Sequence, residues 1–465
     1  MTDGPQPDPG GRRRRRFPSL EESVRDELGC TLRARWVFPV DGPPIAGGVV
    51  TIHGNVIVEV GQSAQLQTGS TIDLGDVALI PGLVNAHTHL EFSDLRRPLG
   101  EPGMPLPTWI GEVLAARTER VDTTGAILAG LIESIASGVT TIGEIASEAW
   151  PASVFERLGP SAPHVAMFRE LIGLGDARIS AALAAAAVHL AEGERPVLSI
   201  ERHGLSRTLR PIPLRPALSP HAPYTVHPRL LAGAVALAAE HRGPPTIAHE
   251  RRVPVAMHLA ESREELELLA AGTGPMADLL KNRGVWQPDL FGGRSVREFL
   301  EALSAAPRSL VIHGNYLADD ELALAAQHAQ RMSVVYCPRT HAYFDHPPYP
   351  LARMLAAGVA MAVGTDSRAS NPDLSLLEEL RQIASRHADV PPAKILELGT
   401  LAGARALGWG RELGSMGFFK RADFCVIPIG ARNAHDPHEL LFDCEARVSE
   451  TWIDGRCVAR AEDAD

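Results

Sequence analysis

Short apolar segments alternate with Ala- and Leu-rich segments through the middle of the chain, and this alternation limits the fold more than any other feature. Segments such as EVLAARTERVDTTGAILAGLIESIAS and DDELALAAQHAQ place apolar residues at helical spacing. Eight segments between them are predicted to be buried strands: ALIPGLVNAHTH, VTTIGEI, HVAMFRELIG, LRPALSPHAP, VPVAMHLAES, SLVIHGN, SVVYCPRTH and VAMAVGTD. Strands that alternate with helices form parallel sheets, and eight such units close into a barrel. The sequence therefore predicts an α/β chain with a (β/α)8 TIM barrel.

Shorter β-branched segments flank this region on both sides. CTLRARWVFP, GGVVTIHG and NVIVEVG precede it, and ADFCVIPIG and SETWIDGRCVAR follow it. Gly, Pro and Asp separate them, as in small antiparallel sheets. We expect residues 28–80 and 415–465 to form one composite β-sandwich domain, and residues 81–414 to form the barrel. Residues 1–27, with five consecutive arginines, are predicted to be a disordered basic tail.

Composition excludes several classes of protein. A formal net charge of −11 and 5% aromatic residues argue against a nucleic-acid-binding surface. No apolar run approaches the roughly 20 residues that cross a bilayer. The five cysteines are dispersed and form no CxxC pair, which favours a reducing compartment. We expect a cytoplasmic protein with no nucleic-acid or membrane partner, and a homodimer is left open. The stretches 193–216 and 242–252 do not fit the alternation and are expected to be surface insertions.

Almost every predicted barrel strand ends in polar residues, at the rim where such barrels hold their active sites. His87 and His89 are two residues apart on one strand, so both imidazoles face the same side. His258 and Asp366 end two later strands. Taken alone, the two histidines could be an incidental pair with no role in metal binding. Imidazole and carboxylate together, however, are good ligands for a divalent ion. The four residues predict a single-metal site, with Zn²⁺ as the first expectation and Fe²⁺ as the alternative.

Two further residues are candidates for moving protons. Glu261 follows His258 by three positions, where its carboxylate can reach a metal-bound water without binding the metal. The alternative is a glutamate that faces solvent at a helix start. His313 stands at the end of the predicted strand in LVIHG. The alternative role for it is that of a core histidine whose hydrogen bonds are satisfied. A divalent ion lowers the pKa of a bound water to about 7, and Asp366 can also accept its proton. We expect Glu261, His313 and Asp366 to be catalytic.

The chain resembles the amidohydrolase superfamily, in its mononuclear deaminase branch of cytosine, guanine, methylthioadenosine/S-adenosylhomocysteine and aminodeoxyfutalosine deaminases. PGLVNAHTHLE, SPHAPYTV, HLAES, IHGN and GTDS stand in family order, and the resemblance covers about residues 30–460. It implies that Glu261 is the proton shuttle and that His313 polarises the substrate or orients water. It also implies one metal, because no lysine ends the fourth strand. The metal ligands that it implies are His87, His89, His258 and Asp366.

The segments SPHAPYTVHP and GTDSRASNPDLSLLEEL are most similar to aminodeoxyfutalosine deaminases. That resemblance implies a small heterocyclic substrate, a 6-aminopurine nucleoside converted to its 6-oxo form. For Trp109, the alternative is a packing role on a helix. His341 stands where family members often have Asn, because this chain reads CPRTH where they read CPxSN. The candidate substrate contacts are His221, Trp109, Glu91, Glu170 and His341.

Three other functions are alternatives to deamination. A chlorohydrolase or cyclic amidohydrolase acting on a triazine- or pyrimidine-like ring would use the same metal and water. Glu261 favours deamination, because ammonia leaves poorly without a proton. A non-catalytic barrel is disfavoured because all six rim residues are present. An editing-type cytidine deaminase needs H-x-E with P-C-x-x-C, and that arrangement is missing from the sequence.

Overall fold

The computed structural model describes residues 15–16, 29–64, 70–118, 120, 122–193, 214–241, 252–442 and 446–461. The predictions for the tail and for the two insertions therefore fall largely outside the described residues. The exception is β1 (Arg15–Arg16), which pairs antiparallel with β19 (Arg456–Ala461). At these two residues the prediction of a disordered tail was wrong. The physical reason is that an edge strand such as β19 offers unpaired backbone groups to a passing segment.

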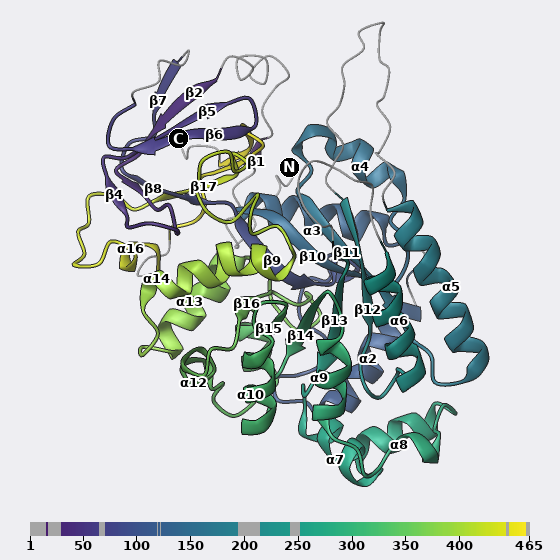
Figure 1. Ribbon diagram of the computed structural model, residues 1–465. Helices are drawn as coiled ribbons and strands as arrows, with labels where there is room; N and C mark the ends of the chain where they lie inside the picture. Colours follow the sequence, from purple (N-terminus) through teal and green to yellow (C-terminus); the bar gives the residue numbers. More distant parts are fainter. Residues whose placement is uncertain are drawn as a thin grey trace, which may run out of the picture.

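Within the described residues, one sheet contains eight parallel strands in chain order, as predicted (Figure 1). Each strand is buried along most of its length, which explains why the segments are almost continuously apolar. The strands are β9 (Leu83–Thr88), β10 (Val139–Ala146), β11 (His164–Leu171), β12 (Leu214–Pro220), β13 (Pro254–Leu259), β14 (Arg308–His313), β15 (Met332–Tyr336) and β16 (Met361–Val363).

The sheet closes on itself where the end of β9 meets the turn after β16. Thr88 and Asp366 form a parallel bridge, and the backbone N–H of Asp366 donates to the carbonyl of His87 at 3.1 Å. The Asn85 side chain donates to Thr365 at 2.8 Å across the same seam. These contacts confirm the predicted (β/α)8 barrel, and they place His87 and Asp366 side by side.

Helices surround the barrel, and local sequence signals explain several of their ends. At the start of α9, the side chain of Glu298 accepts the N–H of Ser295 at 3.1 Å, and the buried face carries Phe299, Leu300 and Leu303. No described helix combines the length and apolar character that a bilayer crossing requires. The α-helices are α2 (Leu106–Thr118), α3 (Thr124–Ala136), α4 (Ala152–Leu158), α5 (Asp176–Glu192), α6 (Pro228–Glu240), α7 (Arg263–Ala271), α8 (Pro275–Asn282), α9 (Val296–Ser304), α10 (Asp319–Gln327), α11 (Pro338–Tyr343), α12 (Leu351–Ala356), α13 (Leu376–Arg386), α14 (Pro392–Glu397), α15 (Gly403–Ala406) and α16 (Glu439–Phe442). The 3-10 helices are η2 (Leu90–Phe92), η3 (Gly159–Ser161) and η4 (Pro288–Leu290), and η5 (Leu398–Ala402) is a π-helix.

A small β domain is assembled from both ends of the chain, and in Figure 1 its purple N-terminal and yellow C-terminal strands lie together beside the barrel. Leu32 and Val50 of one sheet pack with Leu79 and Phe424 of the other in a single buried cluster, so the domain is a sandwich as predicted. In the larger sheet of this domain, the described strands lie in the order β1, β19, β18 (Glu450–Ile453), β17 (Phe424–Pro428), β8 (Val77–Pro81), β3 (Trp36–Val37) and β4 (Ile45–Ala46). The smaller one orders β6 (Val56–Gly61), β5 (Val49–His53), β2 (Cys30–Arg33) and β7 (Ser70–Asp73).

One predicted strand is divided between the two domains. The segment ALIPGLVNAHTH was expected to be the first barrel strand, but β8 belongs to the β sandwich and only β9 to the barrel. Gly82 separates them, and a Cβ there would lie 2.2 Å from the Thr140 side chain. Only glycine fits this close approach, so the chain changes sheets at that residue.

Gly364 lies at the end of β16 against the backbone of the strand that carries the two histidines. A Cβ at Gly364 would lie 2.8 Å from the carbonyl oxygen and 2.9 Å from the amide nitrogen of His87. Since backbone cannot yield as a side chain can, Gly364→Ala should destabilise the protein by about 1–3 kcal/mol, measured by urea unfolding. Gly111→Ala in α2 is the control, because nothing lies within 4 Å of its added Cβ. That variant should gain about 0.5–1 kcal/mol, and equal stability of the two variants would contradict the prediction.

Candidate active site

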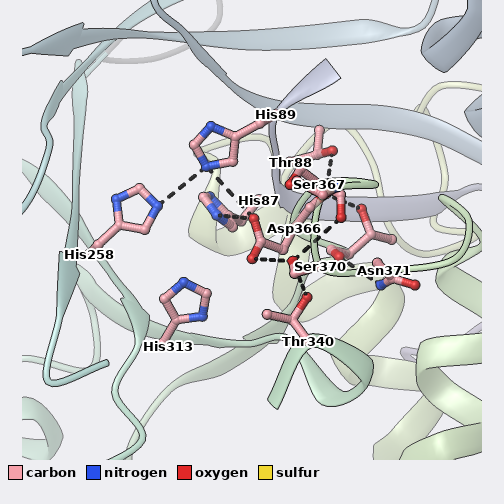
Figure 2. Close-up of polar contacts among 12 residues, drawn as sticks. His87, Thr88, His89, His258, His313, Thr340, Asp366, Ser367, Ser370 and Asn371 are labelled. Atoms are coloured by element: carbon pink, nitrogen blue, oxygen red, sulfur yellow. Dashed lines mark hydrogen bonds and ion pairs between the residues drawn. The ribbon is translucent and has the colours of Figure 1, made fainter. Parts of the chain in front are cut away.

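Five side chains from four barrel strands meet at the rim, around a common space (Figure 2). The potential ligand atoms of His87, His258 and His313 lie within 4.8 Å of one another. The same holds for His87, His89 and Asp366. The strands β9, β13, β14 and β16 bring them together, because parallel strands end on one side of the sheet. The structure thus unites the four predicted metal ligands and one predicted catalytic histidine.

The spacing of these atoms suits a divalent ion. The distances are 3.4 Å from His89 Nε2 to His258 Nε2, 3.6 Å from His87 Nε2 to Asp366 Oδ1, and 3.8 Å from His89 Nε2 to Asp366 Oδ1. Tetrahedral ligands with bonds of about 2.0–2.1 Å lie about 3.3 Å apart. Both ring nitrogens of His87 are buried and lack a hydrogen-bond partner among the described residues. Such nitrogens are costly unless a cation accepts a lone pair, so the residues fit a metal centre.

Contacts behind the cluster orient two of these groups. His258 Nδ1 lies 3.1 Å from the carbonyl oxygen of His221 and can only donate to it, which leaves Nε2 with its lone pair toward the cluster. Ser370 donates to Asp366 Oδ2 at 3.1 Å, and Thr340 lies 3.0 Å from the Ser370 hydroxyl (Figure 2). Since Ser370 has one proton, Thr340 donates to it. This chain of hydroxyls leaves Oδ1 of Asp366 free to face the histidines.

Burial sets the charges of the cluster. It lowers the pKa of His89, His258 and His313, so these imidazoles are neutral at physiological pH. Burial alone would raise the pKa of Asp366, but the neighbouring imidazole of His87, followed by those of His313 and His89, holds it well below its usual range. Neutral nitrogen donors beside one carboxylate are a typical ligand set for a divalent transition metal.

Glu261 lies just beyond β13 with its carboxyl beside His313, at 3.4 Å from Oε1 to Nε2. Burial raises its pKa well above the usual value, and the negative charges of Asp366 and Glu265 raise it further. Glu265 also holds the turn, because it accepts the N–H of Ala260 at 3.0 Å and that of Glu261 at 2.9 Å. A carboxyl that keeps its proton near neutral pH, beside a metal centre, is placed to act as a general acid.

The backbone is strained at two residues of the cluster. His313 has φ of 68° and Asp366 has φ of 56°, in the left-handed region that residues other than glycine rarely adopt. Each such residue costs on the order of 1 kcal/mol and persists only where its surroundings enforce it. The hydroxyl of Tyr349 donates to the carbonyl of His313 at 2.9 Å, and the N–H of Asp366 is bound to β9. Strain of this kind is typical of functional sites.

Three of the five predicted substrate contacts form one polar wall. Arg117 Nη2 lies 2.6 Å from Glu91 Oε1 and 3.8 Å from Glu170 Oε2. His221 Nε2 lies 4.0 Å from Glu170 Oε1, and the His221 ring is 5.1 Å from that of His258. Burial, followed by the charge of Arg117, lowers the pKa of His221 to about 3. The wall therefore combines two carboxyls, one cation and one neutral imidazole next to the metal ligands.

Trp109 packs against neighbouring side chains, which is the alternative role that the sequence left open. Its ring is 5.2 Å from that of Phe344, and its Nε1 donates to the carbonyl of Ala369 at 3.3 Å. It is partly buried against an apolar cluster that includes Leu106 and Tyr224. The structure gives Trp109 a packing role at the edge of the site.

His341 is not at a strand end. The segment SVVYCPRTH was predicted to be one strand, but β15 ends at Tyr336 and α11 begins at Pro338, so this part of the prediction was wrong. Proline at the first helical position explains the change. The His341 ring is 5.5 Å from that of Tyr349, which in turn is bound to His313. His341 thus packs against Tyr349, whose hydroxyl binds the backbone of His313.

Several residues that shape the site were not predicted from the sequence. Arg117 is one basic residue among many, and its two carboxylate partners are 26 and 53 positions away. Glu144 accepts the N–H of Leu90 and so holds the turn after the histidine pair. No motif indicates such contacts in one sequence. The missed residues are Arg117, Glu144, Glu265, Thr340, Tyr349 and Ser370.

Residues 78–458 match the family model described as the amidohydrolase family. This match spans most of the chain, so the chain belongs to the amidohydrolase family. The predicted class of hydrolase is thereby confirmed.

Relatives and solved structures agree with this assignment. A 5-methylthioadenosine/S-adenosylhomocysteine deaminase of Moorella thermoacetica is 29% identical over 426 residues, which cover 87% of this chain and 86% of that protein. The crystal structure of Helicobacter pylori aminofutalosine deaminase is 22% identical, with a TM-score of 0.73 and coverage of 93% and 100%. Atrazine chlorohydrolase of Arthrobacter aurescens, complexed with zinc, is 20% identical, with a TM-score of 0.72 and coverage of 93% and 95%.

Glu265 should make the stability of the protein depend on pH. Burial raises the pKa of Glu265 to about 7, compared with about 4.3 in an unfolded chain. The folded state therefore holds the proton more tightly, so the free energy of unfolding falls as pH rises from about 4.3 to 7, by up to about 1.4 kcal/mol per pH unit. Glu265→Gln should flatten this slope, measured by urea unfolding at several pH values.

The slope is the readout for Glu265, because the variant is also less stable at every pH after losing one acceptor for the turn. Glu267→Gln is the matched control, since Glu267 is exposed on the same helix. It should keep the slope of the unmodified protein. An unchanged slope in Glu265→Gln would contradict the prediction.

Proposed function

We propose that the protein is a metal-dependent hydrolytic deaminase of an amino-substituted nitrogen heterocycle, with a 6-aminopurine nucleoside such as aminodeoxyfutalosine as its substrate. The observation that carries the proposal is the buried Glu261 carboxyl, with its raised pKa, beside His313 and the ligand cluster. The deaminase names of the Moorella relative and the Helicobacter structure support it.

The metal ligands in this proposal are His87, His89, His258 and Asp366, whose donor atoms have the spacing described above. We propose Zn²⁺ as the ion, because three imidazoles and one carboxylate suit it and the chlorohydrolase structure contains zinc. When bound, such an ion lowers the pKa of a water to about 7 and so supplies a nucleophile at neutral pH.

The protein side chains then move protons and hold the ring. Glu261 donates its proton to a ring nitrogen, which makes the adjacent carbon electrophilic. The ionised Asp366 accepts a proton from the attacking water, while Ser370 fixes its other oxygen. His313, neutral and 3.4 Å from Glu261, donates a hydrogen bond to the oxygen that gains charge. The wall of Glu91, Arg117, Glu170 and His221 contacts the polar part of the substrate.

Release of chloride from a triazine, or hydrolysis of a cyclic amide, would use the same water. Deamination is favoured because ammonia leaves poorly without proton transfer: the buried acid Glu261 protonates the ring nitrogen, and the proton that Asp366 accepts from the water passes to the leaving amine. We expect the purified, metal-loaded protein to release ammonia from at least one purine nucleoside in a panel that also contains pterins, pyrimidines and chlorotriazines. Release of chloride or ring-opened products without ammonia would refute the proposal.

Glu261→Gln should separate catalysis from metal binding. The amide cannot donate an acidic proton, so turnover should fall on the order of 10²-fold or more, while metal content stays near one ion per chain. Ammonia release and metal analysis on the same sample measure both quantities. Glu267→Gln, exposed on the same helix, should keep full turnover. Near-normal turnover in Glu261→Gln would remove the assigned role of this residue.

A further inference from the structure

A cavity of about 1070 Å³ lies at the opposite end of the barrel from the ligand cluster. Its lining includes Arg215, the second residue of β12, and Arg308 and Met361, the first residues of β14 and β16. His313 is five residues along β14 from Arg308, a distance of about 16 Å in an extended strand. The cavity is therefore separate from the site described above.

The cavity wall is strongly basic, although the chain as a whole carries a net charge of −11. Glu397 lies 2.5 Å from Lys394 and 3.2 Å from Arg405, and Glu412 is paired with Arg215. The described lining contains six basic side chains and these two carboxylates. The basic side chains are Arg215, Arg252, Arg308, Lys394, Arg405 and Arg411.

Two guanidinium groups approach the same stretch of backbone on this wall. Arg215 donates to the carbonyl of Gly408 at 2.7 Å, and Arg308 donates to the carbonyl of Arg405. A Cβ at Gly408 would lie in tight contact with Arg308 Nε at 3.3 Å and at an ordinary contact distance of 3.8 Å from Arg215 Nη1, so glycine leaves room for the Arg308 side chain. The wall is built to hold cations close together.

Arg308 carries the clearest sign of an unmet charge. Its Nε is buried and has no hydrogen-bond partner among the described residues. Burial, followed by the positive charge of Arg252, lowers its pKa. A cation that is partly withdrawn from water and stands near a like charge is costly, and a bound anion would offset that cost.

We propose that this cavity binds a small molecule that carries two or more phosphate groups. Guanidinium groups match phosphate oxygens in shape and are the preferred residues for such ligands. The volume is in the range of sites for small molecules, which are about 300–1,000 Å³. Arg252, Arg405 and Arg411 are exposed at the edge, where a ligand can enter, and Arg215 and Arg308 form the inner wall.

The test uses inorganic pyrophosphate as the probe and the full-length, metal-loaded protein, by calorimetric titration at constant ionic strength. Saturable binding is expected. Arg308→Gln removes one charge and the unpaired Nε, and should weaken binding at least about 10-fold. Arg252→Gln at the exposed edge should also weaken it, and this variant is expected to fold normally because its side chain is exposed.

Two further variants control for charge alone. Arg297→Gln removes an exposed arginine that is paired with Glu301 and Asp320, far along the surface from the cavity lining, and should leave the affinity unchanged. Glu397→Gln removes a carboxylate from the cavity and should tighten binding. A gain of this kind requires the probe to lie beside Glu397.

Two outcomes would overturn the proposal. Equal affinity in the unmodified protein, Arg308→Gln and Arg252→Gln would show that pyrophosphate binds elsewhere, for instance at the metal centre. No saturable binding up to about 10 mM would show that the cavity has no useful affinity for phosphates. If an oligoglutamate peptide binds in an Arg308-dependent manner and pyrophosphate does not, the cavity receives an acidic protein segment instead.

Discussion

The seam between the end of β9 and the turn after β16 is the interaction on which the site depends. There, the carbonyl of His87 accepts the N–H groups of Thr365 and Asp366, and Thr88 donates to the carbonyl of Asp366 at 2.8 Å. These bonds close the barrel, and they also impose the left-handed backbone that aims the Asp366 carboxylate at the histidines. Closure of the fold and assembly of the ligand set are therefore one event. Gly364 serves both, because any larger residue would push the two segments apart.

A single dry environment gives these groups opposite protonation states. Burial removes the charge of His89, His258 and His313, and the same burial keeps the proton on Glu261. Only Asp366 stays ionised, because the surrounding imidazoles and the hydroxyl of Ser370 stabilise its negative charge. At this rim Asp366 is therefore a proton acceptor and Glu261 a proton donor, although both carboxyl groups are buried. Both residues carry a carboxyl group, so the difference between their protonation states follows from their neighbours.

The fold was largely predictable, because it follows from short-range periodicity. The eight barrel segments, the pair His87 and His89, and the strand-end positions of His258 and Asp366 all come from spacing along the chain. The errors occur where contacts between distant residues decide. The break at Gly82 depends on Thr140 in the next strand, and the support of Asp366 depends on Thr340, 26 positions before it. Arg117 pairs with Glu170 across 53 positions. A single sequence carries no signal for these partners.

The two-ended construction of the β sandwich has a consequence for synthesis of the chain. Strand β8 leads directly into β9, and one edge of β8 is covered by β17, with Ile80 opposite Cys425. A ribosome makes these two residues 345 positions apart. At a rate of about 5–20 residues per second, β8 waits at least about 17 seconds for its partner. During that interval the strand before the histidine pair has an exposed edge, open to incorrect pairing. Strand β17 therefore completes the anchor of the first barrel strand, and the nascent barrel cannot finish folding until β17 has been synthesised.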